Sequence, residues 1–160
     1  MQLDAYDIRI LTELQRDNRL TSASLSEVVH LSPAACLRRV DRLRRAGVII
    51  ADVSVVAPEK VGVTLQAVVR VALETKHAED LSAFEGAARA APEVQQCWHV
   101  SGGFDYVLVL SCRDMADYDA FLRRFLTDNP LVRNYDACIA LRRVKTGSTV
   151  PLQQPTAETA

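Results

Sequence analysis

Five arginines fall within eight consecutive residues, although the whole chain of 160 residues carries a net charge of −1. They are Arg38, Arg39, Arg42, Arg44 and Arg45. A guanidinium group pairs with phosphate oxygens and with the O6 and N7 atoms of guanine. Such contacts need only a local basic face and not a basic protein. The cluster therefore indicates an anion-binding surface, with nucleic acid as the first candidate partner and an ordinary solvated helix face as the alternative.

The residues that flank this cluster predict the bounds of a helix. Ser32 can accept hydrogen bonds from free backbone N–H groups, and Pro33 fits the first helical position because it lacks an N–H group. Gly47 is a usual left-handed terminator. At about 100° per residue, the side opposite Arg38 is apolar, and the N-terminal end of the Arg38 side is small. The apolar residues are Cys36, Val40 and Leu43, and the small ones are Ala34 and Ala35. Because small residues let a helix approach base edges in the major groove, the pattern predicts a recognition helix.

Two further helices are predicted before this one. Apolar residues at helical spacing place the first at residues 7–14 and the second at residues 22–29. Either Thr21 caps the second helix, or Ser24 caps it in a capping box with Glu27. A three-residue connection then leads into the arginine-bearing helix. This order is that of a helix-turn-helix, in which the second helix of the pair enters the major groove.

The second half of the chain alternates strand and helix patterns. Strands are predicted at 65–73, 94–101, 105–112 and 135–144, and helices at 78–91 and 114–125. The order βαββαβ is the ferredoxin-like arrangement, so the fold class of the whole chain is α+β. These strands carry more apolar surface than two helices can cover. We therefore expect a dimer or a larger even-numbered assembly.

The predicted organisation along the chain has four segments. They are an N-terminal helix-turn-helix at 1–50, a linker strand and hinge at 51–64, the βαββαβ domain at 65–146, and a C-terminal tail at 147–160. The linker strand is predicted from β-branched residues that precede Pro58. The tail is polar and contains proline, so we expect its end to be mobile.

The turn between the two middle strands is a second candidate site. Gly102 and Gly103 supply positive φ and leave backbone N–H groups uncovered, and such groups can hold a carboxylate. Asp105 can pair with an ammonium group. A zwitterionic amino acid needs one partner of each kind, so the turn is a candidate ligand site. The alternative is a plain hairpin with a turn-favouring aspartate.

Other kinds of site find little support in the sequence. The cysteines at 36, 97, 112 and 138 lack zinc-ligand spacing, and Cys97 with His99 supplies only two ligands. No catalytic triad spacing and no phosphate-binding loop is found. We therefore expect no enzyme activity, no metal and no cofactor. The chain has no apolar run of the roughly 18 residues that a membrane span needs and no signal-peptide core, which predicts a cytoplasmic protein.

Four motifs, in order along the chain, resemble those of the Lrp/AsnC (feast/famine) family. They are LDAYDIRIL at 3–11, LSPAACLRRVDRLRRAGVI at 31–49, VSGGFDY at 100–106 and LRRVKTGSTVPL at 141–152. Any one of these motifs would be weak alone, but four in the right order are specific. The resemblance covers about residues 2–152, which is nearly the whole chain.

The resemblance implies a winged helix-turn-helix that binds double-stranded DNA, followed by a ferredoxin-like (RAM) domain that forms homodimers or larger even-numbered assemblies. It also implies an effector, an amino acid or a related molecule, bound by the RAM domain. The residues expected to contact DNA are Ser32, Pro33, Ala34, Ala35, Arg38, Arg39 and Arg42. The residues expected to contact the effector are Ser101, Gly102, Gly103, Asp105, Tyr106 and, at its side-chain end, Tyr135.

The sequence thus predicts a sequence-specific transcriptional regulator whose DNA binding or assembly responds to an amino-acid-like effector. One alternative is an architectural DNA-binding protein that works without a ligand, and the turn at 102–106 weighs against it. Another is a small-molecule-binding or enzymatic ferredoxin-like protein whose first helices only mediate assembly. The basic face of the third helix weighs against that alternative, because an assembly helix does not need it.

Overall fold

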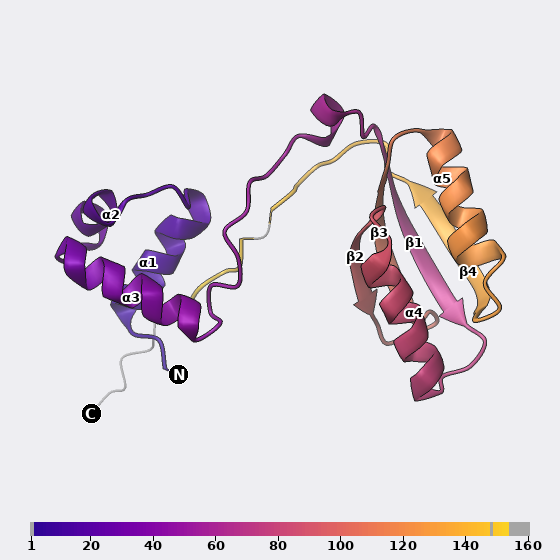
Figure 1. Ribbon diagram of the computed structural model, residues 1–160, viewed down its shortest axis with the longest axis horizontal. Coiled ribbons are helices and arrows are strands. Elements are labelled where there is room, and N and C mark those ends of the chain that lie inside the picture. The colour runs from indigo at the N-terminus through magenta and orange to yellow at the C-terminus, as the bar shows by residue number, and fades with distance from the viewer. Residues whose placement is uncertain (1, 148, 154–160) are drawn as a thin grey trace. The chain divides into compact units, whose positions relative to one another are not determined.

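The computed structural model describes residues 2–147 and 149–153, and within them the chain divides into two compact units (Figure 1). The first unit combines the residues up to Ser54 with the segment that begins at Lys145. The second unit spans Val55–Val144. The C-terminal segment, which we expected to be a separate tail, is therefore grouped with the N-terminal helices. Residues 154–160, where the mobile end was expected, lie outside the described residues.

Three helices form the first unit: α1 (Ala5–Arg16), α2 (Ser22–Val29) and α3 (Pro33–Arg45). Each begins at a side chain that accepts a backbone N–H group, and these caps are Asp4, Thr21 and Ser32. Helix α1 starts two residues earlier than predicted because Asp4 and Asp7 form a reciprocal capping box. For α2 the cap is Thr21, whose hydroxyl accepts from the Ser24 N–H group, and not Ser24 itself.

The core of the first unit is small. His30, with φ of 58°, reverses the chain between α2 and α3 in the left-handed region. Seven buried apolar side chains then meet between the three helices: Ile10, Leu11, Leu25, Val29, Cys36, Val40 and Leu43. A core of this size stabilises a fold only modestly, so contacts from outside the three helices matter.

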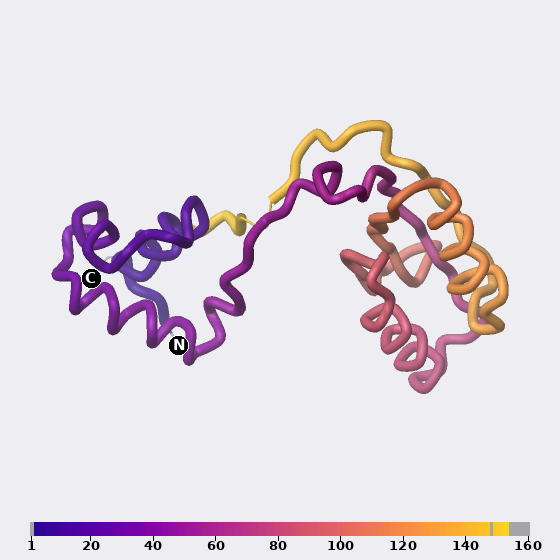
Figure 2. The backbone as a smooth tube through the Cα atoms, turned by 45° about the horizontal axis from the view of Figure 1, so that its top comes forward, coloured from indigo at the N-terminus to yellow at the C-terminus, as the bar shows by residue number. Residues whose placement is uncertain are grey.

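The C-terminal segment supplies such contacts, and Figure 2 shows part of it, in yellow, beside the N-terminal helices with which it forms one unit. The Gln15 side chain donates to the Val150 carbonyl at 3.2 Å and accepts from the Val150 N–H group at 2.6 Å. Two residues further on, Leu152 packs against the core of the three helices. These contacts therefore add to the small core of the three helices.

The second unit is a four-stranded antiparallel sheet with two helices. Its elements are β1 (Leu65–Leu73), α4 (Ala78–Ala90), β2 (Val94–His99), β3 (Tyr106–Cys112), α5 (Met115–Leu122), a π-helical turn at Arg123–Thr127, and β4 (Val132–Ile139). The strand order is β2-β3-β1-β4, with every neighbouring pair antiparallel. Phe84 of α4 lies 5.4 Å from Phe125, ring centre to ring centre, so both helical segments cover the same face. The predicted βαββαβ arrangement is confirmed.

The opposite face, which we call the open sheet face, has no covering element among the described residues of this unit. Strand alternation directs Val68 of β1, Val107 and Val109 of β3, and Trp98 of β2 toward it. Trp98 is 59% exposed and Val68 is 40% exposed. An apolar patch of this kind on a sheet is typical of a protein–protein contact surface.

Two predicted strands differ from the structure by more than two residues. The stretch from Ala51 to Ala57 forms no strand in the chain as described, and it leads into a short 3-10 helix at Pro58–Val61. Its valines, such as Val55 at 94%, are exposed, because a strand needs a neighbour for its backbone groups and this stretch has none. Strand β4 covers 132–139 instead of 135–144, because its partner β1 extends only from Leu65 to Leu73.

Candidate functional site

Helix α3 has the two faces that its sequence predicted. Cys36, Val40 and Leu43 are buried against α1 and α2. The opposite face is exposed, and it begins with Pro33 and Ala34, whose small side chains leave the backbone accessible. Ser32 caps the helix by accepting from the Ala35 N–H group at 3.2 Å. The predicted DNA-contacting residues from 32 to 38 therefore share one surface at the start of this helix.

The arginines of α3 do not all face solvent freely. Arg39 contacts Asp4 at 2.7 Å and Asp7 at 2.8 Å, and Arg42 donates to both oxygens of Asp7 at 2.6 Å. The Asp7 side chain is only 1% exposed, so this pairing is built into the packing of α1 on α3. Further along, Arg44 pairs with an aspartate of the following segment and Arg45 with one on its own helix.

Arg38 has a different environment. It is exposed, and within residues 2–147 and 149–153 it is the one arginine of α3 without an ion pair. Its guanidinium group can therefore meet a phosphate or a guanine edge without first leaving a carboxylate. Of the three arginines expected to contact DNA, the structure leaves Arg38 unpaired and ties Arg39 and Arg42 to α1.

The glycine-rich turn lies between β2 and β3, as predicted. Gly102 has φ of 135°, a conformation that side chains rarely adopt, and Ser101, Gly102 and Gly103 are all exposed. The Val100 N–H group donates to the Asp105 carbonyl at 2.9 Å and closes the turn. The exposed backbone of this turn remains available to an anionic ligand group.

Asp105 is occupied by the protein itself. Asp105 as a whole is 5% exposed. Its carboxylate accepts a hydrogen bond from the Leu73 N–H group at 2.9 Å and forms an ion pair with Lys76 at 2.9 Å. The Leu73 hydrogen bond, followed by the Lys76 contact, outweighs desolvation and lowers the pKa of the Asp105 carboxyl. The carboxylate thus fastens the end of β1 to the turn, which is the structural role that the plain-hairpin alternative describes.

We expect Asp105→Asn to change how stability depends on pH. A carboxyl with a lowered folded pKa stabilises fully above its unfolded pKa, and this contribution is lost as pH falls through the folded pKa. The variant keeps an acceptor for the Leu73 N–H group but loses the charge, at a cost of about 1–2 kcal/mol near pH 7. Urea melts from pH 7 to pH 3 should show the wild-type advantage shrinking toward acid. Asp128→Asn, at an exposed position, is the control, and an advantage that is constant with pH would contradict this account.

Tyr135 lies away from the turn. Both Tyr135 on β4 and Tyr106 on β3 are register partners of Val71, so the two tyrosines share the helix-covered face with β1 between them. The Tyr135 hydroxyl lies 3.0 Å from that of Thr127 at the end of the π-helical turn. The structure therefore groups Ser101 to Tyr106 in one place and sets Tyr135 apart from them.

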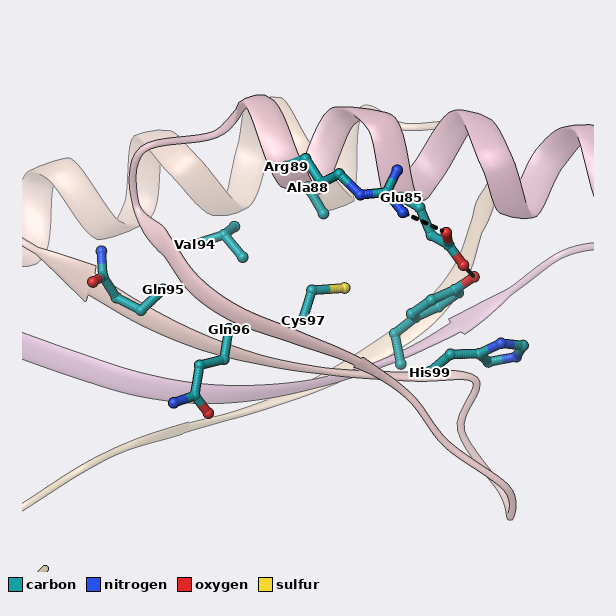
Figure 3. Close-up of a pocket in the computed structure, with 9 residues that line it drawn as sticks. Glu85, Ala88, Arg89, Val94, Gln95, Gln96, Cys97 and His99 are labelled. Atoms are coloured by element: carbon teal, nitrogen blue, oxygen red, sulfur yellow. Dashed lines mark hydrogen bonds and ion pairs between the residues drawn. The ribbon is translucent and has the colours of Figure 1, made fainter. Parts of the chain in front are cut away.

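A groove between α4 and β2 was not foreseen from the sequence. Its volume is about 450 Å³, and Figure 3 shows Glu85 and Arg89 of α4 above Cys97 and His99 of β2. The buried Tyr106 donates from its hydroxyl to Glu85 at 3.1 Å, and Arg89 pairs with Glu85 at 3.0 Å. Desolvation and the Glu85 contact raise the pKa of Tyr106, so its hydroxyl stays a proton donor. The groove has the size of a small-ligand site and offers one carboxylate and one guanidinium group.

Tyr106 belongs both to the predicted turn and to the wall of this groove. The one sequence signal for the groove was the spacing of Glu85 and Arg89, which places them one turn apart on a helix. That signal becomes meaningful only once β2 is known to be the edge strand beside α4. Across the part of the chain that the structure describes, no three histidine, cysteine or acidic side chains gather as metal ligands, and no helix has the length and apolar character to cross a bilayer.

Two protein-family models match the chain, one for each unit, although the second model extends past Val144 into the segment that the structure groups with the N-terminal helices. Residues 3–50 match a model described as winged helix-turn-helix DNA-binding, and residues 66–150 match one described as the Lrp/AsnC ligand binding domain. The described part of the first unit contains the three helices but no strand that would form a wing.

Individual relatives match over almost the whole length. An uncharacterized HTH-type transcriptional regulator of Sinorhizobium fredii is 39% identical, over 96% of this chain and 90% of its own. The leucine-responsive regulatory protein of Haemophilus influenzae is 38% identical, over 89% and 86%. Among solved structures, a transcriptional regulator of Neisseria meningitidis in complex with L-Met is similar with a TM-score of 0.88 and 35% identity, covering 94% of this chain and 97% of that one.

Proposed function

This chain belongs to the Lrp/AsnC family of transcriptional regulators, and on that premise we propose that an amino acid bound by its second unit controls how its first unit binds DNA. The observation that carries the proposal is the combination, in one chain, of an exposed arginine on a helix-turn-helix with a ligand-sized polar groove in the ferredoxin-like unit. A regulator of this kind works where the chromosome is, so the cytoplasm is the proposed compartment.

The proposed DNA-binding surface is the exposed start of α3. Ala34 and Ala35 permit close approach to base edges, the capping Ser32 and Pro33 lie at the entry of the helix, and Arg38 supplies the charge. The N-terminus of α3 also directs its dipole toward a phosphate in this geometry. Arg39 and Arg42 border the same surface, where both pair with Asp7.

The proposed effector is a small zwitterion, as in the Neisseria relative, whose complex contains L-Met. We place its carboxylate in the groove at Arg89, whose guanidinium group lies beside Glu85. The exposed backbone of Ser101, Gly102 and Gly103, which does not line the groove, is proposed to contact another polar group of the effector. Its ammonium group pairs with Glu85, because the side chain of Glu85 is 33% exposed, whereas the Asp105 carboxylate is already held by Leu73 and Lys76. In this arrangement Tyr106 joins the two halves of the site, and Asp105 and Tyr135 support it from within the fold.

The proposed assembly is a homodimer, or a larger even-numbered homo-oligomer, formed through the open sheet face. The effector site and the DNA-binding surface belong to different units, so an effector can act only through differential affinity for two states of the assembly or of the units. Two DNA-binding helices related by a two-fold axis would contact half-sites about 34 Å, or a multiple of it, apart.

Duplex selection from a random pool, followed by binding measurements with each common amino acid, tests this function. We expect wild-type protein to enrich a two-fold sequence and at least one amino acid to shift its affinity by about 5–150-fold, the usual range of coupling. Calorimetry on Glu85→Gln and Asp105→Asn then locates the site. Loss of binding in Glu85→Gln alone supports the proposed ammonium partner.

Other outcomes separate the competing functions. Loss of amino-acid binding in folded Asp105→Asn alone would show that Asp105, at the turn, is the partner of the ammonium group. Enrichment of a sequence without a response to any amino acid would favour an architectural DNA-binding protein. An amino acid that binds a chain without affinity for DNA would favour a ligand-binding protein whose helices mediate only assembly.

A further inference from the structure

We propose that Asp7 is a positioning residue that divides the arginines of α3 into a pair held by the protein, Arg39 and Arg42, and a free one, Arg38, that contacts DNA. The inference rests on the proposed role of α3 in DNA binding. It goes further by assigning different tasks to arginines that lie on one helix within five residues of each other.

The contacts of Asp7 are those of a fully satisfied buried carboxylate. Its side chain is 1% exposed, and its oxygens accept from Arg39 at 2.8 Å, from Arg42 at 2.6 Å and from the Asp4 N–H group at 3.2 Å. Asp4, which is half exposed, accepts from Arg39 as well. Removing one partner of a buried ion pair leaves an uncompensated charge. Separation of Asp7 from Arg39 and Arg42 is therefore costly in free energy.

The two paired arginines differ from Arg38 in their freedom to move. The Arg39 side chain is 25% exposed, and its guanidinium group also lies 5.4 Å from the centre of the Tyr6 ring. The Arg42 side chain is 47% exposed, but one of its nitrogens contacts both oxygens of Asp7. A DNA phosphate would have to replace a buried carboxylate at either arginine. At Arg38 it would replace only water.

The consequence is a smaller and more selective electrostatic footprint. Each phosphate contact made by a cationic side chain adds about one unit to the log–log dependence of affinity on salt. Because Asp7 neutralises Arg39 and Arg42, α3 offers fewer sequence-independent contacts to DNA phosphates than its five arginines would indicate. Discrimination between bases then depends more on Arg38 and on the small residues before it.

The experiment compares the salt dependence of DNA binding among folded variants of the full chain. The probes are a short mixed-sequence duplex and the best duplex selected with wild-type protein. We expect Arg38→Ala to reduce the slope by about one unit, and Arg42→Ala to leave the slope unchanged while lowering the melting temperature. Asp7→Asn should raise the slope on mixed-sequence DNA by up to about two units, because Arg39 and Arg42 become available to phosphates.

Two further variants make the result specific. Asp4→Asn releases only one contact of Arg39 at a half-exposed position, so it remains folded and should raise the slope less than Asp7→Asn does. Glu13→Gln is the matched control, because it removes the same charge from α1, where Glu13 pairs with Arg16 of the same helix. Its slope should equal that of wild type.

The positioning role and the proposed function fail in different ways. Wild-type protein that shows no salt-dependent affinity for duplex DNA would refute the proposed function. Wild-type protein that binds, together with folded Asp7→Asn and Asp4→Asn variants whose slopes are unchanged or reduced, would refute the role of Asp7. An equal loss of slope in Arg42→Ala and Arg38→Ala would also refute it. If Asp7→Asn does not fold, Asp4→Asn and the comparison of the two arginine variants decide the matter.

Discussion

Val109→Asp, a single charge on the open sheet face, is expected to convert the proposed homo-oligomer into monomers. Val109 lies in the middle of this face, between Val68 of β1 and Gln96 of β2, and the exposed Trp98 is on the same edge strand as Gln96. The side chain points away from the core of its own unit, so an aspartate there can remain hydrated and the monomer can fold. In an interface the same carboxylate would be buried without a partner, which costs several kcal/mol.

The loss of assembly should appear in DNA binding as well. Two linked DNA-binding helices bind more tightly than one by about 10²–10⁴-fold when both reach their half-sites. We therefore expect Val109→Asp to lose at least two orders of magnitude of affinity for a two-fold duplex, but little for a single half-site. Light scattering at micromolar concentration gives the mass directly.

Met115→Glu is a suitable control for this variant, because Met115 is 55% exposed on α5 and lies on the helix side of the sheet. It adds the same charge to the same unit and should leave mass and affinity unchanged. A monomeric wild-type protein, or an assembly of unchanged mass in Val109→Asp, would show that the open sheet face is not the interface.

Removing residues 150–160 is expected to destabilise the helix-turn-helix. The deletion takes away the two hydrogen bonds between Gln15 and Val150 and the packing of Leu152 on the helical core. Burial of a leucine side chain is worth about 1.5–3 kcal/mol when complete, and Leu152 is only half-buried. With the hydrogen bonds included, we expect a loss of about 2 kcal/mol.

In a unit this small, a loss of about 2 kcal/mol corresponds to a fall in melting temperature on the order of 10 °C. Hydrogen exchange at the amides of α1 to α3 would show whether the change is local to the first unit. Leu152→Ala should reproduce about half of the effect. Val150→Ala should reproduce little of it, because the hydrogen bonds use the Val150 backbone and its side chain is 59% exposed. Equal effects of the two substitutions would contradict this account.

The sequence predicted best those features that depend on neighbouring residues. The bounds of α2 followed from apolar residues at helical spacing, and the start of α3 followed from Ser32 and Pro33, whose effects reach only three or four residues. The order βαββαβ followed from the alternation of strand and helix patterns along the chain. The glycine turn was located because Gly102 adopts a conformation that few other residues tolerate.

Features that depend on distant partners could not be predicted in the same way. The helical wheel placed Arg42 about 40° from Arg38, on the outer face. Its actual contact is Asp7, 35 residues earlier in the chain. The end of β4 depends on where its antiparallel partner β1 begins, and the groove between α4 and β2 depends on β2 being an edge strand. In each case the deciding interaction joins segments whose closeness no local pattern encodes.

The return of the C-terminal segment to α1 has a consequence for synthesis on the ribosome. Residues up to 54 emerge first, but the segment with Val150 and Leu152, which completes their packing, is translated about 100 residues later. At about 5–20 residues per second, the interval is on the order of 5–20 s. During that time the three helices lack the contacts with Val150 and Leu152. The ribosome is then translating the sheet unit, which lies between the helices and this segment in the sequence. The DNA-binding unit is therefore the first part of this protein to begin folding and the last to finish.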